Sequence, residues 1–190
     1  MNDIIKAIEV FKNGGVVIFP TDTVFGIGCR IDRKDSIERI FKIKNREGNV
    51  PLPILVSDFE MAQKYLEFLE QKIIDSLIKK YWPGALTIVA KCKTEKVLDI
   101  VRSGKDSVAI RMPNNKTLLE IIKEINIPII GTSANFHGKP SVFKFEDLDK
   151  DLISKVDFVL DGNCGGESAS TIIDVTQTPW KILRQGIIKI

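Results

Sequence analysis

The sequence has few of the residues that build metal centres and disulfide frameworks: three cysteines, Cys29, Cys92 and Cys164, and one histidine, His137. The cysteines are odd in number, widely spaced and outside any CxxC pair, so neither a disulfide framework nor a zinc cluster is indicated. One histidine cannot by itself build a histidine-based metal site. Reduced thiols are typical of the cytosol, and we therefore expect a cytoplasmic protein without a protein-held metal.

Long apolar runs and a strong net charge are also lacking. No stretch approaches the roughly 18 apolar residues of a membrane span, and acidic residues interrupt the N-terminal region where a signal peptide would be continuously apolar. We therefore expect no membrane contact. The 28 basic and 25 acidic residues leave a charge of +3, which permits a polyanionic partner but lacks the basic excess of a dedicated nucleic-acid binder.

The usual signatures of nucleotide binding and nucleophilic catalysis are absent. The sequence has no GxxxxGK[ST], and Gly26-Ile27-Gly28 does not extend to GxGxxG because Ile31 stands where the third glycine belongs. Ser133 is not part of a GxSxG motif, and His137 follows it in the same loop without an acid to orient the imidazole. A nucleotide would therefore bind without a P-loop, and we expect His137 to be a solvated loop residue.

What the sequence does have is an alternation of helix-like and strand-like segments. Its 190 residues, 44% hydrophobic and 28% charged, predict one domain, residues 1–190, of mixed α and β structure. Hydrophobic spacing predicts helices at 4–11, 37–41, 61–69, 73–81, 114–125 and 145–154. The capping-box pair Ser57/Glu60 precedes the third of these, and Thr117/Glu120 stand at capping-box spacing in the fifth. Strands are predicted at 16–19, 24–30, 51–56, 86–90, 107–112, 127–130, 156–160, 170–175, 181–183 and 187–190. The strand at 107–112 alternates, with Arg111 opposite in phase to Val108 and Ile110.

Polar clusters fall at the ends of these predicted elements. They occupy residues 21–23, 44–46, 107–111, 131–141 and 168–171, with Arg184 shortly after the last. Ligands of open α/β sheets lie beyond the strand ends, and arginines among many hydroxyl groups are typical of a site for phosphates. Taken singly, each cluster also has a structural explanation, as a helix-end charge, an exposed ion pair or a surface turn.

Seven motifs stand in an order that resembles the YrdC family over nearly the whole chain. They are PTDTVFGIG at 20–28, KNRxxxxPL at 44–52, WPGALT at 82–87, VAIRMP at 108–113, TSANFHGKPS at 132–141, STIID at 170–174 and ILRQG at 182–186. The resemblance implies a YrdC-like fold, in which a twisted sheet of parallel and antiparallel strands is flanked by helices and has a concave ligand-binding face.

The resemblance also implies L-threonylcarbamoyladenylate synthesis, which joins L-threonine, bicarbonate and ATP into threonylcarbamoyl-AMP and pyrophosphate. Threonylcarbamoyl transferase machinery then uses the product to modify adenosine 37 of tRNA. By this resemblance, Thr23, Arg111 and Ser170 hold threonine. The implied ATP-binding residues are Arg46, Ser107, Ser133, Ser141 and Arg184, with Lys44 and Arg46 as catalytic residues that neutralise charge near the phosphates, and with Mg²⁺ accompanying ATP without dedicated protein ligands.

Two positions depart from the family pattern. Val50 and Leu55 stand where many relatives carry asparagine and histidine, so the contacts of those two residues are not carried over. Longer relatives also add a C-terminal domain that closes over the site. Two other functions stay open: a double-stranded RNA or tRNA-binding module, and carbamoyl transfer as in hydrogenase maturation proteins, although the zinc-finger and acylphosphatase modules found there have no counterpart in this sequence.

Overall fold

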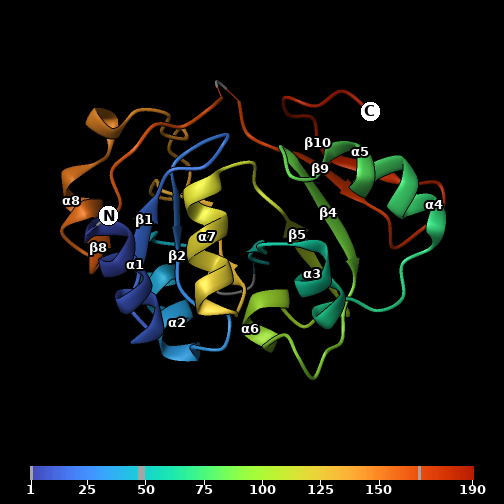
Figure 1. The fold of residues 1–190 in the computed structure, drawn as a ribbon, viewed down its shortest axis with the longest axis horizontal. Coiled ribbons are helices and arrows are strands. Elements are labelled where there is room, and N and C mark those ends of the chain that lie inside the picture. The colour runs from blue at the N-terminus through green and yellow to red at the C-terminus, as the bar shows by residue number, and fades with distance from the viewer. Residues whose placement is uncertain (1, 47–49, 167) are drawn as a thin grey trace.

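The structure is a computed structural model that describes residues 2–46, 50–166 and 168–190. Its strands form two sheets, each with parallel and antiparallel pairs (Figure 1). The smaller sheet has the order β7 (Thr132–Ser133), β2 (Gly26–Gly28), β1 (Val17–Phe19) and β8 (Phe158–Val159). The larger has the order β10 (Lys181–Arg184), β9 (Thr171–Asp174), β4 (Leu86–Lys91), β5 (Ser107–Arg111), β3 (Ile54–Leu55) and β6 (Ile129–Ile130).

Helices flank both sheets, and the predicted class of mixed sheet with flanking helices is confirmed. The difference from the prediction is that the strands divide into two sheets. No helix in the described part of the chain is long and apolar enough to cross a bilayer. The helices are α1 (Asn2–Lys12), α2 (Lys34–Ile43), α3 (Phe59–Tyr65), α4 (Gln71–Ile73), the π-helical turn η1 (Ile74–Ile78), α5 (Lys79–Tyr81), α6 (Asp99–Arg102), α7 (Lys116–Ile125), the 3₁₀ turn η2 (Phe145–Asp147) and α8 (Lys150–Ile153).

The smaller sheet is held by apolar burial and by one carboxylate. All three residues of β1 are fully buried, and α1 packs against β1, β8 and α7. Asp157, just before β8, accepts a hydrogen bond from the Val16 N–H at 2.7 Å and forms an ion pair with Arg39 at 2.6 Å. Because Val16 precedes β1, these contacts hold β8 in parallel register beside it.

The larger sheet separates a core face from a ligand-accessible face. In β4, Leu86 and Ile88 are fully buried in the core, whereas Thr87 and Val89, which alternate with them, border a cavity. Arg111 at the end of β5 borders the same cavity. In Figure 1, α3, α4 and α5 lie in front of this sheet. The alternation of side chains along these two strands therefore leaves one face for helices and the other for a ligand.

Gly131 carries the chain directly from one sheet to the other. It lies between β6, an edge of the larger sheet, and β7, an edge of the smaller sheet. Its N–H donates to the Pro53 carbonyl at 2.9 Å, and a Cβ here would lie 2.4 Å from Cδ1 of Leu55. Glycine is required by this close approach, and the stretch predicted as a loop after residue 130 begins instead with a strand.

Two helix starts differ from the predicted capping boxes. Asp58, rather than Ser57, caps α3 by accepting the Met61 N–H at 2.7 Å. Asn115 caps α7 by accepting the Leu118 N–H at 3.0 Å, two residues before Thr117. Asp and Asn accept such bonds as well as Ser and Thr do, so the pattern alone did not select the cap.

Three further segments differ from the prediction. The helix predicted at 145–154 is two short pieces, η2 and α8, because Asp149 caps a new helix by accepting the N–H of Asp151 at 2.8 Å. The strand predicted at 187–190 is absent, and the Ile188 carbonyl instead accepts from Thr171 Oγ1 at 2.6 Å. Helix α6 lies in a charged segment for which no element was predicted.

Candidate active site

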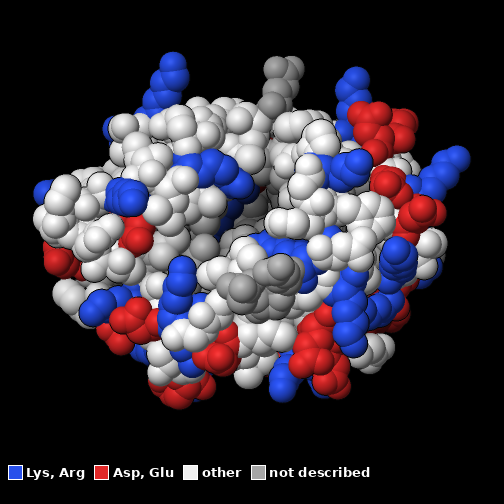
Figure 2. All heavy atoms as spheres, turned by 180° about the vertical axis from the view of Figure 1, so that it is seen from behind, with Lys and Arg blue, Asp and Glu red and all other residues white. Residues whose placement is uncertain are grey.

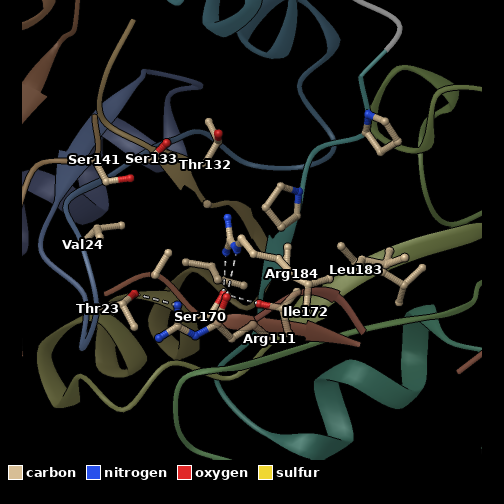
Figure 3. Close-up of a pocket in the computed structure, with 18 of the residues that line it drawn as sticks. Thr23, Val24, Arg111, Thr132, Ser133, Ser141, Ser170, Ile172, Leu183 and Arg184 are labelled. Carbon is tan, nitrogen blue, oxygen red and sulfur yellow. Dashed lines mark hydrogen bonds between the residues drawn. The ribbon is translucent and has the colours of Figure 1, made fainter. Parts of the chain in front are cut away.

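A cavity of about 350 Å³ opens on the ligand-accessible face of the larger sheet. Its floor comes from β3, β4, β5, β9 and β10, and its opposite wall comes from loops and strand ends of the smaller sheet (Figure 3). Figure 2 shows a hollow on this side of the molecule with basic side chains at its mouth. The cavity therefore lies where both sheets supply side chains.

The cavity brings together most of the predicted site residues. Thr23, Arg46, Arg111, Ser133, Ser141, Ser170 and Arg184 line it, and Leu55 does so as well. Ser107 is not in this lining. It borders an adjoining hollow of about 600 Å³ that shares Pro51, Val89, Ala109 and Leu183 with the cavity. Which ligand each residue contacts stays a prediction.

Arg111 is the most deeply buried of the three arginines that line the cavity. It is 6% exposed, and burial lowers the pKa of its guanidinium, an effect that the neighbouring Asp22 opposes. Its Nε donates to the Gly84 carbonyl at 2.9 Å, its Nη1 to Thr23 Oγ1 at 2.9 Å, and its Nη2 to the carboxylate of Asp22. The predicted phase of Arg111 in its strand is confirmed, and its charge already has an acid partner.

The turn at 21–24 fixes Thr23 beside Arg111. Thr21 Oγ1 accepts the N–H groups of Thr23 at 3.0 Å and Val24 at 3.1 Å, and donates to the Val24 carbonyl at 2.7 Å. This side-chain turn buries both threonines, which are 5% and 1% exposed. The Thr23 hydroxyl is thereby presented to the cavity in one orientation.

Ser170 and Arg184 form a second connected group on the floor. Arg184 donates from Nη2 to Ser170 Oγ and from Nε to the Ser170 carbonyl, both at 3.0 Å (Figure 3). Ser170 Oγ also lies 2.9 Å from Thr87 Oγ1. Burial, then the charge of Arg111, lowers the pKa of the Arg184 guanidinium. Arg184 therefore has hydrogen-bond partners within the floor.

A β-bulge at Leu183 sets which way Arg184 points. Ile182 pairs with Ile173, whereas Arg184 pairs with the next residue of β9, Ile172, so Leu183 is an extra residue. Directly paired residues share a face of the sheet. Arg184 thus lies on the face of Ile172, which borders the cavity, while Ile182 lies on the face of the buried Ile173.

Arg46 reaches the cavity from the segment that follows α2. Its Nη2 donates to the Pro51 carbonyl at 3.0 Å and its Nη1 to Thr132 Oγ1 at 3.3 Å, while its Nε is buried without a partner among the described residues. Burial lowers the pKa of this guanidinium. Residues 47–49 of the KNRxxxxPL motif lie outside the described residues.

Lys44 lies behind the cavity wall rather than in the cavity. It is 2% exposed, and its ammonium donates to the carbonyls of Ser133 and Asn135. Burial and the charge of Arg46 lower the pKa of Lys44 to about 7. Lys44 is not in the cavity lining, and its predicted contribution of charge near the phosphates stays a prediction. His137, whose imidazole was expected to be solvated, is exposed.

Three residues with a part in this arrangement carried no predicted role: Asp22, Thr87 and Asn135. Asp22 pairs with Arg111, Thr87 contacts Ser170, and Asn135 accepts from Lys44. All three lie inside the motifs quoted above. A buried arginine on a strand requires an acid nearby, and that requirement could have identified Asp22.

The cavity has a positive character because two of its guanidinium groups lack acids. No carboxylate lies within 4.0 Å of the charged atoms of Arg46, Arg184 or Lys44 within the described residues, whereas Arg111 has Asp22. Positive charge that has no acid partner attracts anions to the cavity. The arrangement is therefore suited to an anionic ligand held by guanidinium and hydroxyl groups.

Comparison with known proteins shows to which family the chain belongs. The sequence profile of the Sua5/YciO/YrdC family, described as telomere recombination, matches residues 9–186. The chain belongs to this family. Family membership confirms the resemblance drawn from the seven motifs, and it covers the segments that build both sheets and the cavity.

Several relatives in this family are named as synthases. The threonylcarbamoyl-AMP synthase of Bacillus subtilis is 33% identical over 184 residues, which are 96% of this chain and 53% of the relative. A putative threonylcarbamoyl-AMP synthase of Methanocaldococcus jannaschii is 38% identical, covering 97% of this chain and 88% of the relative. The chain thus spans about half the length of some relatives that it matches and most of the length of others.

A solved structure in the family carries a ligand. The crystal structure of Pyrococcus abyssi Sua5 complexed with L-threonine matches this chain with a TM-score of 0.90 and 34% identity. The match covers 96% of this chain and 54% of that one. A TM-score this high indicates that the two sheets are arranged alike in the two proteins.

Proposed function

We propose that the protein is an L-threonylcarbamoyladenylate synthase, which forms threonylcarbamoyl-AMP and pyrophosphate from L-threonine, bicarbonate or CO₂, and ATP. The observation that carries the proposal is the convergence of three guanidinium groups on one cavity, one paired with an acid and two not. The similarity to named synthases, and to a relative solved with L-threonine, supports it.

Threonine is assigned to the part of the cavity around Thr23, Arg111 and Ser170. Arg111 suits the carboxylate, because a guanidinium offers five donors and only part of them are used by Thr23, Asp22 and Gly84. The buried hydroxyls of Thr23 and Ser170 suit the polar groups of a small amino acid. Their fixed orientation would reduce the entropy lost on binding.

ATP is assigned to the part with uncompensated charge. Arg46 and Arg184 supply cationic donors for the phosphates, and Ser133 and Ser141 stand on the wall opposite the floor. Ser107, in the adjoining hollow, would meet the part of the nucleotide that extends beyond Leu183. A ligand longer than the cavity fits this division, since the hollow and the cavity share four residues.

The proposed chemistry needs positioning rather than a protein nucleophile. The deprotonated amine of threonine attacks CO₂ to form an N–C bond, and loss of the amine proton leaves a carbamate. A carbamate oxygen then attacks the α-phosphorus of ATP, the bond from that phosphorus to the bridging oxygen breaks, and pyrophosphate leaves with the electron pair. Arg46 and Arg184 would offset the negative charge that develops on the phosphates.

Mg²⁺ is proposed to accompany ATP. No group of three or more His, Cys, Asp or Glu side chains that could hold a metal gathers within residues 2–46, 50–166 and 168–190. Mg²⁺ is commonly bound through phosphate oxygens and water, which fits a site of this composition. When bound, the ion would neutralise phosphate charge, and the arginines would orient the nucleotide.

The partner proteins that we propose are inferred from the chemistry of the product. A mixed anhydride of a carbamate and AMP is a donor for acyl transfer, so we propose that threonylcarbamoyl transferase machinery consumes it to modify tRNA. Direct binding of tRNA or double-stranded RNA is kept as the alternative function. We propose a cytoplasmic location, since the three cysteines are free.

The test is release of pyrophosphate from ATP in the presence of threonine and bicarbonate. The wild-type chain should release pyrophosphate only when all three substrates are present, and radiolabel from bicarbonate should appear in a nucleotide product. Arg46→Ala should lower kcat/KM by about 100-fold, because a charge-assisted contact to the transition state is lost.

A matched control is Arg33→Ala, which removes an arginine just before α2 that does not line the cavity. It should leave the rate within about twofold of the wild type, as is usual for surface substitutions. Threonine-independent pyrophosphate release, or none at all together with tight tRNA binding, would contradict the synthase and favour the RNA-binding module.

A further inference from the structure

The ammonium of Lys44 is enclosed by one short segment of the chain. Lys44 is the C-cap residue of α2, and its Nζ donates to the Ser133 carbonyl, to the Asn135 carbonyl at 2.6 Å and to Asn135 Oδ1 at 3.2 Å. An ammonium has three N–H donors, so these acceptors use all of them. No donor of Lys44 is left to face the cavity.

The same segment is bound to the end of α2 by two further contacts. The N–H of His137 donates to the Lys44 carbonyl at 2.8 Å. Arg46, two residues further on, donates to Thr132 Oγ1 at 3.3 Å. Residues 132–137 are therefore joined to the end of α2 through a backbone bond, an ammonium and a guanidinium.

Asn135 connects this arrangement to a residue that lines the cavity. Its Oδ1 accepts from Lys44 Nζ and also from Ser133 Oγ, the latter at 2.5 Å. The direction of the Ser133 hydroxyl thus depends on an amide that Lys44 holds. Arg46 depends on the same wall, because Thr132 is one of its two hydrogen-bond partners.

We infer that Lys44 is a positioning residue: it fastens residues 132–137 to the end of α2, and so sets the places of Ser133 and Arg46 without contacting a ligand itself. For Lys44 to reach a phosphate, its ammonium would have to leave three acceptors. Two of these are main-chain carbonyls beside a buried side chain, and unpaired buried carbonyls are costly. The inference rests on the proposed function only for the identity of the ligand.

The first test needs no substrate. Amide hydrogen–deuterium exchange is compared between the wild type, Lys44→Met and the control Lys42→Met, which removes an exposed lysine of the same helix. Lys44→Met should raise the exchange rates of amides in residues 132–137 by at least about tenfold, because the local opening free energy falls. Lys42→Met should leave them unchanged. Unchanged exchange in Lys44→Met would overturn the inference.

A second test separates positioning from direct contact. Lys44→Met should weaken ATP binding about tenfold and change the affinity for threonine less than twofold. Asn135→Ala leaves the lysine in place but removes an acceptor that holds it, so it should change both affinities by the same amounts. The double variant should be no weaker than either single variant, because one linkage is broken in each. Additive losses, or normal ATP affinity in Asn135→Ala, would overturn the inference.

The synthase proposal and the inference about Lys44 can be tested independently of each other. If the wild type makes no pyrophosphate, the synthase proposal fails while the exchange result still decides the part played by Lys44. If Lys44→Met does not fold, exchange in Asn135→Ala decides in its place: faster exchange confined to residues 132–137 supports the inference, and wild-type exchange there overturns it.

Discussion

Two arginines on the floor of the cavity are held in opposite ways. Arg111 is 6% exposed, donates from all three guanidinium nitrogens to protein acceptors and forms an ion pair with Asp22. Arg184 donates only to Ser170 and has no acid within 4.0 Å in the described part of the chain. The positive charge of Arg111 is therefore balanced by Asp22 before a ligand binds, whereas no acid balances the charge of Arg184.

The difference indicates what each arginine can contribute. A compensated guanidinium adds little net charge but holds its remaining donors in fixed positions, which suits a small zwitterion such as an amino acid. A guanidinium without an acid adds net positive charge, which suits a polyanion such as ATP. One part of the cavity thus supplies net positive charge, and another part supplies hydrogen-bond donors in fixed positions.

The largest expected effect comes from removing the acid. Asp22→Ala leaves Arg111 as an unpaired buried charge, which should lower the free energy of unfolding by about 3 to 5 kcal/mol. Urea denaturation measures this value. The control is Asp32→Ala, whose partner Arg30 lies in a more exposed ion pair, with a loss of about 0 to 1 kcal/mol. Equal losses in the two variants would mean that the buried ion pair of Arg111 stabilises the fold no more than the more exposed pair of Arg30 does.

The opposite pattern is expected at Arg184. Arg184→Ala should weaken ATP binding about 100-fold, or about 2.7 kcal/mol, because a charge-assisted contact is lost. Its free energy of unfolding should stay within about 1 kcal/mol of the wild type, since no acid loses its partner. Isothermal titration calorimetry and urea denaturation measure the two quantities. A large stability loss with unchanged ATP affinity would reverse the assignment.

Lys44 extends the comparison to a basic group with hydrogen bonds but no acid. Its pKa is lowered to about 7 in the folded protein, from the usual 10.5. The folded state then binds fewer protons than the unfolded state between these values, so stability rises with pH in that window. Relative to Lys44→Met, the wild type should gain about 2 kcal/mol between pH 7 and pH 9. Urea denaturation at both pH values measures the gain, and parallel pH profiles would contradict it.

The smallest effect is expected at Thr87, whose hydroxyl contacts the Ser170 hydroxyl that Arg184 also contacts. Thr87→Val keeps the shape of the side chain but removes the hydroxyl that contacts Ser170 at 2.9 Å. The free energy of unfolding should fall by about 1 kcal/mol, which is typical of one neutral hydrogen bond. The KM for threonine should rise only a few-fold, because Ser170 keeps its contact with Arg184. A loss as large as that of Asp22→Ala would mean that the two parts of the floor are not independent.

The sequence predicted what depends on short repeating patterns. Local patterns predicted both central strands, at 86–90 and 107–112, and the alternation in the second placed Arg111 opposite Val108 and Ile110, as the structure has it. Most of the predicted site residues line the cavity and lie within the motifs, whereas Lys44 and Ser107 are outside its lining. Side-chain periodicity reports such facts because it depends on neighbours within a few residues.

What the sequence could not predict depends on single residues in unusual geometry. Lys44 and Arg46 stand in one motif, yet Asn45 between them has a φ of 50°, and the two side chains reach different places. Gly131 divides the strands between two sheets within one residue. Both features depend on tertiary contacts, which no local pattern contains.

The bulge at Leu183 means that the charge of the cavity depends on the pairing register of β10 as well as on the identity of its residues. If Leu183 paired regularly with Ile172, Arg184 would lie two residues beyond Ile182 in an unbroken strand and would follow it onto the face of the buried Ile173. The same four side chains in a regularly paired β10 would therefore leave the cavity without this cation. In this strand a shift of register by one residue acts as strongly as the replacement of a functional residue.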